Sequence, residues 1–356
     1  MSELKFVYVT YIATTPEKLW QALTDGAFTR RYWFGTAVES DWTPGSRVTF
    51  RSDGEAHDSG EVLDCVPYRR LSYSWQVEFH EVFRREKPSR VTFELEPTGG
   101  AEVKLTVTHD EFEPGSKVHA AVSNGWPMIL SSLKSLLETG HCFDVDQPRT
   151  SARRARACDR ARREQRRLAR VPKMSAPKFV PNTVYVTYIA STPEKVWEAL
   201  TRAEFTRQYF FGHSIELEPK TGGSFILRAP DGSVHMRGRV IEYDPPRRLA
   251  TTWSVEGMEA FRELPESLVT YDIEPMGGSV KLTMTEAHQW EVPDAILAGG
   301  RQGWPFILSS LKSVLETGKP IVVSVKMGPP PEMLEAVKQA CATKPWLKVG
   351  AGKGRG

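Results

Sequence analysis

Three residues at the ends of two candidate strands could transfer protons. His109 ends the stretch "EVKLTVTH", and Glu286 and His288 lie at the matching place in "VKLTMTEAH". Apolar and polar residues alternate in both stretches, and the alternation places all three on the apolar side. An imidazole beside a carboxylate could act as general acid and base, or could hold the polar end of a ligand. The alternative is a hydrogen-bonded polar pair that closes a strand end.

Aromatic residues recur at positions that could line a binding site. A run of three aromatic residues at 32–34 returns at 209–211, and single tryptophans recur later in both halves of the chain. Such rings either fill a core or form the apolar wall of a cavity. The predicted ligand-binding residues are Tyr32, Trp33, Trp75, Phe93 and Trp126 in the first half and Tyr209, Phe210, Trp253, Tyr271 and Trp304 in the second.

The usual signatures of nucleotide, metal and hydrolase chemistry are missing. The sequence contains no GxGxxG, GxxxxGK[ST], HExxH or GxSxG motif. The four cysteines have no CxxC spacing and do not recur between the halves, so we expect free thiols and neither a metal site nor a disulfide framework; they are Cys65, Cys142, Cys158 and Cys341. We therefore expect no cofactor.

The chain contains the same domain twice. Residues 7–35 match residues 184–212 at 21 of 29 positions without a gap. "GWPMILSSLKSLLETG" at 125–140 returns as "GWPFILSSLKSVLETG" at 303–318. A repeat of this length indicates duplication of a whole domain, because solenoid repeats are only about 20 to 50 residues long.

Each copy has the pattern of a strand, a helical region, several antiparallel strands and a long helix. "FVYVTYIA" is typical of a strand, and "TTPEKLWQALT" has an N-cap threonine followed by a proline, as helices often do. "RLSYSWQVEF" and "RVTFELEP" alternate as half-buried strands do. The segment 115–140 carries apolar residues at helical spacing and ends in Gly140, a natural C-cap.

This order resembles the helix-grip fold of the SRPBCC or START-like superfamily. "ATTPEKLWQALTDGAFTRRYWFG", "PYRRLSYSW" and "NGWPMILSSLKSLLE" carry the resemblance, together with their counterparts in the second half. They are similar to the C-terminal domain of the activator of the ninety-kilodalton heat-shock chaperone's ATPase. The resemblance implies an α+β fold with two tandem helix-grip domains, in each of which a curved antiparallel sheet wraps around the long C-terminal helix and leaves a cavity.

We place the first domain at residues 1–141 and the second at 179–319. Residues 142–178 are interpreted as a flexible linker, and residues 320–356 as a tail with a short amphipathic helix. Residues 149–170 hold ten arginines and a net charge of +8, whereas the whole chain carries +3. A solvated linker is the favoured interpretation of this run, and binding of nucleic-acid phosphates is the alternative.

The composition and the resemblance together favour a binding protein over an enzyme. No apolar stretch is long enough for a membrane-spanning helix, and no secretory signal is visible, so we expect a cytoplasmic protein. The expected partner is an apolar or amphipathic small molecule, or a chaperone that the protein regulates. In the eukaryotic activators, chaperone stimulation also involves a separate N-terminal domain, which this sequence replaces by a second copy. A cyclase-like or hydrolase-like enzyme with His109, Glu286 or His288 as acid and base is the alternative, and nucleic-acid tethering is the weakest hypothesis.

Overall fold

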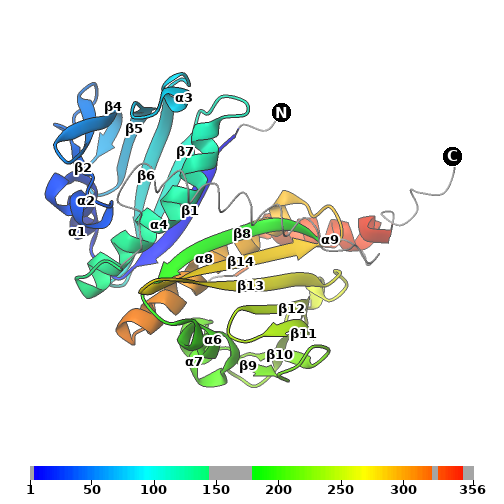
Figure 1. Cartoon of the computed structure of the whole chain (residues 1–356). Helices are drawn as coiled ribbons and strands as arrows, with labels where there is room; N and C mark the ends of the chain where they lie inside the picture. Colours follow the sequence, from blue (N-terminus) through cyan, green and yellow to red (C-terminus); the bar gives the residue numbers. More distant parts are fainter. Residues whose placement is uncertain (1–3, 144–178, 323–327, 348–356) are drawn as a thin grey trace.

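The computed structural model describes residues 4–143, 179–322 and 328–347. These residues form two α+β domains, each with a seven-stranded antiparallel sheet and a long helix packed on one face (Figure 1). The fold class predicted from the sequence is therefore confirmed. The arginine run at 149–170 and Cys158 lie outside the described residues.

The first domain follows the predicted order of elements. Its long helix α4 is capped by the side chain of Ser116 at one end and by Gly140, with φ 80°, at the other. The elements are β1 (Phe6–Ile12), α1 (Pro16–Thr24), α2 (Gly26–Tyr32), β2 (Ala37–Glu39), β3 (Arg47–Ser52), β4 (Glu55–Val66), β5 (Arg70–Val77), α3 (Glu81–Arg84), β6 (Ser89–Pro97), β7 (Val103–Asp110) and α4 (Lys117–Thr139).

The second domain repeats this order and adds a C-terminal helix. Its elements are β8 (Val180–Ile189), α6 (Pro193–Thr201), α7 (Ala203–Tyr209), β9 (Ser214–Leu217), β10 (Ser224–Arg228), β11 (Val234–Asp244), β12 (Arg248–Val255), η1 (Glu259–Phe261), β13 (Ser267–Met276), β14 (Ser279–His288), α8 (Asp294–Thr317), α9 (Pro331–Thr343) and η2 (Pro345–Leu347).

Each sheet places its first strand beside its last one. The strand order is β1-β7-β6-β5-β4-β3-β2 in the first sheet and β8-β14-β13-β12-β11-β10-β9 in the second. In β7 the side chains of Val103, Leu105 and Val107 are fully buried and alternate with half-buried polar residues. This is the pattern expected when one face of a sheet is covered by a helix.

Helix α9 covers a second, smaller apolar cluster at one end of the second domain. Val337 and Ala340 of α9 are buried against Phe261, Trp290 and Leu297. Figure 1 shows α9 beyond the end of the second sheet, beside α8. The amphipathic helix expected in the C-terminal tail is thus packed on the second domain.

The two domains pack against each other through β1 and α4 of the first and β8 and α8 of the second (Figure 1). The ring of Tyr8 stacks on that of Tyr185, with centroids 4.8 Å apart. Tyr8 donates from its hydroxyl to the Val186 carbonyl at 3.0 Å, and Tyr185 donates to the Val9 carbonyl. These two hydrogen bonds are equivalent contacts in which the domains exchange roles, so this part of the interface has approximate twofold symmetry.

Two buried lysines cross this interface. Lys134 Nζ donates to the Tyr11 carbonyl of its own domain at 2.8 Å and to Ser313 Oγ of the other domain at 2.7 Å. Lys312 Nζ donates in the same way to the Tyr188 carbonyl and to Ser135 Oγ, both at 2.7 Å. Burial lowers the pKa of both lysines, and the carboxylate four residues further along each helix opposes that shift.

The carboxylates of these two ion pairs are also shared between the domains. Glu138 pairs with Lys134 and accepts a hydrogen bond from Ser313 Oγ at 2.8 Å. Glu316 pairs with Lys312 and accepts from Ser135 Oγ at 2.8 Å. The side chains of both pairs are only 1% exposed, and each pair is hydrogen-bonded to a serine of the other domain, so the docked domains bury both ion pairs.

None of the helices among the described residues is both long and apolar enough to span a membrane.

Candidate functional site

The aromatic residues predicted to line a cavity in the first domain are in contact with one another. The ring centroids of Trp33, Trp75 and Trp126 lie 5.4–5.9 Å apart, and Phe93 lies 5.8 Å from Trp126. Tyr32 is buried behind them and donates from its hydroxyl to the Ala22 carbonyl at 3.1 Å. The aromatic rings predicted to line a cavity between sheet and helix therefore pack against one another here.

His109 is a fully buried member of this cluster. Its Nδ1 accepts a hydrogen bond from Trp126 Nε1 at 3.0 Å, which leaves the proton on Nε2, 2.7 Å from Ser89 Oγ. Its ring stacks on that of Trp75, with centroids 5.4 Å apart. Burial lowers the pKa of His109 to about 3, so the ring is neutral at physiological pH. Both ring nitrogens are occupied by protein groups, which favours the interpretation of His109 as a hydrogen-bonded core residue.

The second domain retains a small unfilled space inside its core. Tyr209, Phe210, Trp253 and Tyr271 border a cavity of about 20 Å³, room for roughly one water molecule. Trp304, the other predicted residue of this copy, packs 5.5 Å from Trp253, centroid to centroid. The structure thus brings the predicted residues of each copy together.

Glu286 takes the place of His109 in the second domain. Its Oε2 accepts a hydrogen bond from Trp304 Nε1 at 3.1 Å, as His109 accepts from Trp126. Burial raises the pKa of Glu286, because a charge is poorly solvated there, although the bond from Trp304 opposes the shift. A side chain on Gly300 would place its Cβ 2.7 Å from this carboxylate oxygen, so the glycine makes room for the glutamate.

The expected pairing of Glu286 with His288 is not formed. The register of β14 against β8 shifts between Glu286 and Ala287, which turns His288 away from the inner face. His288 Nδ1 lies 2.9 Å from Asn182 Oδ1 on β8, and burial lowers its pKa to about 4. The sequence placed Glu286 and His288 together on the inner face only if the strand continued in register, and the β-bulge between Glu286 and Ala287 breaks that register.

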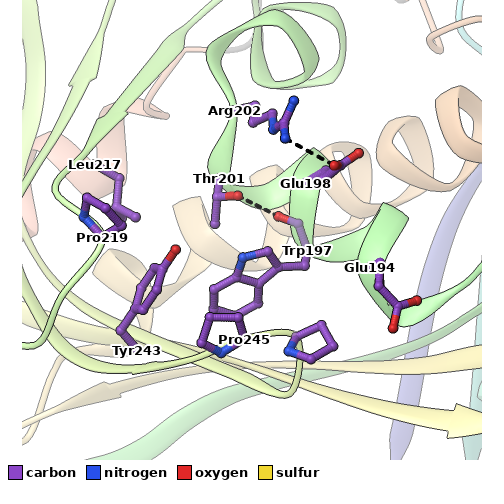
Figure 2. Close-up of a pocket in the computed structure, with 10 residues that line it drawn as sticks. Glu194, Trp197, Glu198, Thr201, Arg202, Leu217, Pro219, Tyr243 and Pro245 are labelled. Carbon is purple, nitrogen blue, oxygen red and sulfur yellow. Dashed lines mark hydrogen bonds and ion pairs between the residues drawn. The ribbon is translucent and has the colours of Figure 1, made fainter.

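A larger groove lies on the outside of the second domain, at the C-terminal end of α6 (Figure 2). It has a volume of about 440 Å³ and is walled by Trp197, Tyr243, Pro219, Pro245 and Pro246. The rings of Trp197 and Tyr243 meet edge to face, with centroids 5.1 Å apart. Sequence reasoning missed this groove, although the change from Trp42 to Pro219 between the copies is visible in the alignment.

Charged side chains stand at the rim of the groove. Arg202 pairs with Glu198 at 3.1 Å across one turn at the end of α6, and Glu194 lies exposed at the other side (Figure 2). Thr201 donates from Oγ1 to the Trp197 carbonyl at 2.7 Å, so its own hydroxyl is directed back along the helix. The groove therefore combines aromatic and proline surfaces with a polar rim.

Within the described residues, no three histidine, cysteine, aspartate or glutamate side chains are grouped so that they could hold a metal ion. Cys65, Cys142 and Cys341 are free thiols.

The fold and the aromatic interior define a pair of helix-grip domains of the SRPBCC type. The model of one family, described as activator of Hsp90 ATPase homolog 1-like protein, matches residues 13–138 and again residues 190–316. The chain belongs to this family and contains its domain in two tandem copies.

Among solved structures, the chain is similar to a protein from Mesorhizobium loti, with 28% identity over 38% of this chain and 96% of that one, at a TM-score of 0.33. It is also similar to the Aha1 dimer from Colwellia psychrerythraea, with 23% identity over 38% and 98% of the two chains, at a TM-score of 0.33. A third similar structure is an HSP90 activator from Plasmodium falciparum, with 23% identity over 38% and 96%, at a TM-score of 0.33. No curated protein matches the chain.

Proposed function

We propose that this chain is a regulatory binding protein whose partner is a chaperone of the Hsp90 class. The observation that carries the proposal is the close packing of rings inside both domains, where they contact one another in the first and border a cavity of about 20 Å³ in the second. A carrier of apolar molecules needs a cavity of about 300 Å³ or more. A protein partner needs only the outer surface, and the family's description as activators of the Hsp90 ATPase supports this choice.

The test uses the full chain and a purified Hsp90-class chaperone from the same organism. We expect saturable binding and a change in the rate of ATP hydrolysis by the chaperone. The protein alone serves as the background control, because its described residues show no nucleotide-binding motif. A chaperone that neither binds the chain nor changes its hydrolysis rate would contradict the proposal.

A second candidate function is binding of a small amphipathic molecule inside the second domain. Support comes from the small cavity beside Trp253 and Tyr271, which could widen if these rings moved, and from the nearby carboxylate of Glu286. Native mass spectrometry of the protein purified from its own host tests this function. We expect a bound mass on the wild-type chain and its loss in Gly300→Val, because the valine crowds Glu286. A wild-type chain without added mass would contradict this second function and leave only the first proposal.

A further inference from the structure

The outer groove of the second domain corresponds to a place that the first domain fills with its own Trp42. Pro219 is the residue equivalent to Trp42, three residues before a glycine that anchors the same turn in both domains. Gly45 N donates to the Val62 carbonyl and Gly222 N to the Val240 carbonyl, both at 2.8 Å. The glycine of the turn is therefore held in the same way in both copies, whereas both the side chain and the backbone differ three residues earlier, because Trp42 has φ 54° and a proline cannot adopt a positive φ.

In the first domain the indole of Trp42 is bound at the end of α1. Its Nε1 donates to the Thr24 carbonyl at 2.9 Å, and the half-buried ring packs against the core. The backbone of Trp42 has φ 54°, a conformation that non-glycine residues rarely adopt, and its amide donates to Ser40 Oγ at 3.2 Å. The loop is thus built to place an indole against the C-terminal end of this helix.

The second domain presents the same acceptor without a donor. Thr201 is equivalent to Thr24, and the hydrogen bonds of the described residues bring no donor to its carbonyl oxygen. Carbonyls in the last turn of a helix have no partner within the helix and need one from outside. Pro219 is too short to reach across the groove and has no N–H group to donate.

The walls of the open groove suit a flat aromatic ring. Trp197 and Tyr243 form an edge-to-face pair in one wall, and Pro219, Pro245 and Pro246 offer flat apolar surfaces (Figure 2). Aromatic rings bind well against such surfaces when one edge can still make a hydrogen bond. An indole meets these conditions, because it combines an apolar face with a single N–H donor, and it is the group that Trp42 places at the equivalent carbonyl of the first domain.

We propose that this groove binds a tryptophan side chain of a partner polypeptide, with the indole N–H donating to the Thr201 carbonyl. The groove is open along the surface, which suits a side chain carried on a polypeptide. The inference rests on the proposed function for the existence of a polypeptide partner and adds the residue that the partner presents. The second domain thereby receives from outside the group that the first domain supplies itself.

The test measures binding of short peptides to the full chain by saturation-transfer NMR. The probe is acetyl-Gly-Trp-Gly-amide, and the matched control carries 1-methyltryptophan, which keeps the ring and lacks the N–H donor. We expect saturable binding of the probe, about tenfold weaker binding of the methylated peptide, and loss of binding in Pro219→Trp. Pro219 is exposed, so this variant should fold, which circular dichroism can check.

The reciprocal variant opens the groove of the first domain. Trp42→Ala should add a second site, in the first domain, that also prefers the probe to the methylated peptide. A chain with both Trp42→Ala and Pro219→Trp should then bind the probe only through the first domain. Equal binding of both peptides, unchanged binding in folded Pro219→Trp, or no saturation up to about 10 mM probe would overturn the inference. These outcomes are independent of whether the chaperone binds, so failure here leaves the proposed function to its own test.

Discussion

The interface between the domains and the outer groove differ in how closely the two copies agree. At the interface Lys134, Ser135 and Glu138 face Lys312, Ser313 and Glu316, which are the same residues in the other copy. At the groove, Trp42 of one copy is replaced by Pro219 of the other.

The difference follows from the geometry of the contacts. In a twofold-related interface every contact between two positions occurs twice, once with each domain supplying the first position. A change in one copy alone therefore leaves a group of the other copy without its partner. The lining of the groove comes from one domain alone, so each copy can close or open its groove without changing the residues of the interface described above.

The largest effect is expected from removing one member of a buried ion pair at the interface. Lys134→Met leaves Glu138 and Ser313 without the ammonium group that both contact. An uncompensated buried charge costs about 3–5 kcal/mol, and we expect a fall of that size in the free energy of unfolding measured in urea.

The control for this prediction replaces both members of the pair. Lys134→Met with Glu138→Leu removes the buried charges together and should recover most of the lost stability. Lys312→Met with and without Glu316→Leu should reproduce both results, because the interface is symmetric. A Lys134→Met chain as stable as the wild type would show that the docked arrangement does not form in solution.

A somewhat smaller effect is expected on the pH dependence of stability, where His109 and Glu286, the acceptors of the Trp126 and Trp304 N–H groups, should act in opposite directions. The pKa of His109 is lowered to about 3 by burial, so between that value and its unfolded value near 6.5 the unfolded state binds more protons. Stability from this group is complete above that range and is lost as the pH falls through it. His288, with a pKa lowered to about 4, acts in the same direction.

Glu286 acts in the opposite direction. Its raised pKa means that the folded state keeps the proton longer, so the group adds stability as the pH falls below its folded pKa. Thermal unfolding at pH 4.5 and pH 7 gives the difference in the free energy of unfolding between the two pH values. This difference should be smaller than in the wild type in His109→Gln and larger in Glu286→Gln, by up to a few kcal/mol. If this difference changed in the same direction in both variants, the opposite contributions assigned to His109 and Glu286 would be contradicted.

A moderate loss of stability is expected from a substitution in α9, the helix that only the second domain has. Val337 of α9 is fully buried against the cluster around Trp290. Val337→Ala should cost about 2 kcal/mol, measured as a lower urea midpoint, because it removes buried apolar groups and leaves a cavity. Lys338→Ala on the exposed face of the same helix is the control. Equal midpoints for the two variants would indicate that α9 does not contribute to the fold.

The fold could be predicted because it depends on patterns within one copy. Alternation in β7 and helical spacing in α4 placed Val107 and Leu133 in the core, and both are fully buried. Alternation failed at His288, because a bulge after Glu286 depends on pairing with β8 and leaves no clear mark in the sequence.

The interface could not be predicted in the same way. Lys134 lies among apolar residues of an amphipathic helix, where a lysine usually reaches solvent. Its burial depends on Ser313 of the other domain, and no pattern within one copy reveals that partner. The aromatic residues predicted to bind a ligand lie in contact with one another in each copy, but whether their rings leave a cavity depends on how the side chains pack.

The smallest effect is expected for an ion pair that has the same spacing as the one at the interface but lies in solvent. Glu81 and Arg85 pair across one turn in α3 and its C-cap, with side chains 76% and 77% exposed. Arg85→Ala should change the free energy of unfolding by no more than about 0.5 kcal/mol, because water solvates the remaining carboxylate and salt screens the pair. Urea unfolding of this variant beside Lys134→Met compares two i,i+4 pairs that differ mainly in burial. If Arg85→Ala lowered the free energy of unfolding as much as Lys134→Met does, the i,i+4 spacing rather than burial at the domain interface would set the strength of these ion pairs. The proposed difference between the interface and the exposed surface would then be contradicted.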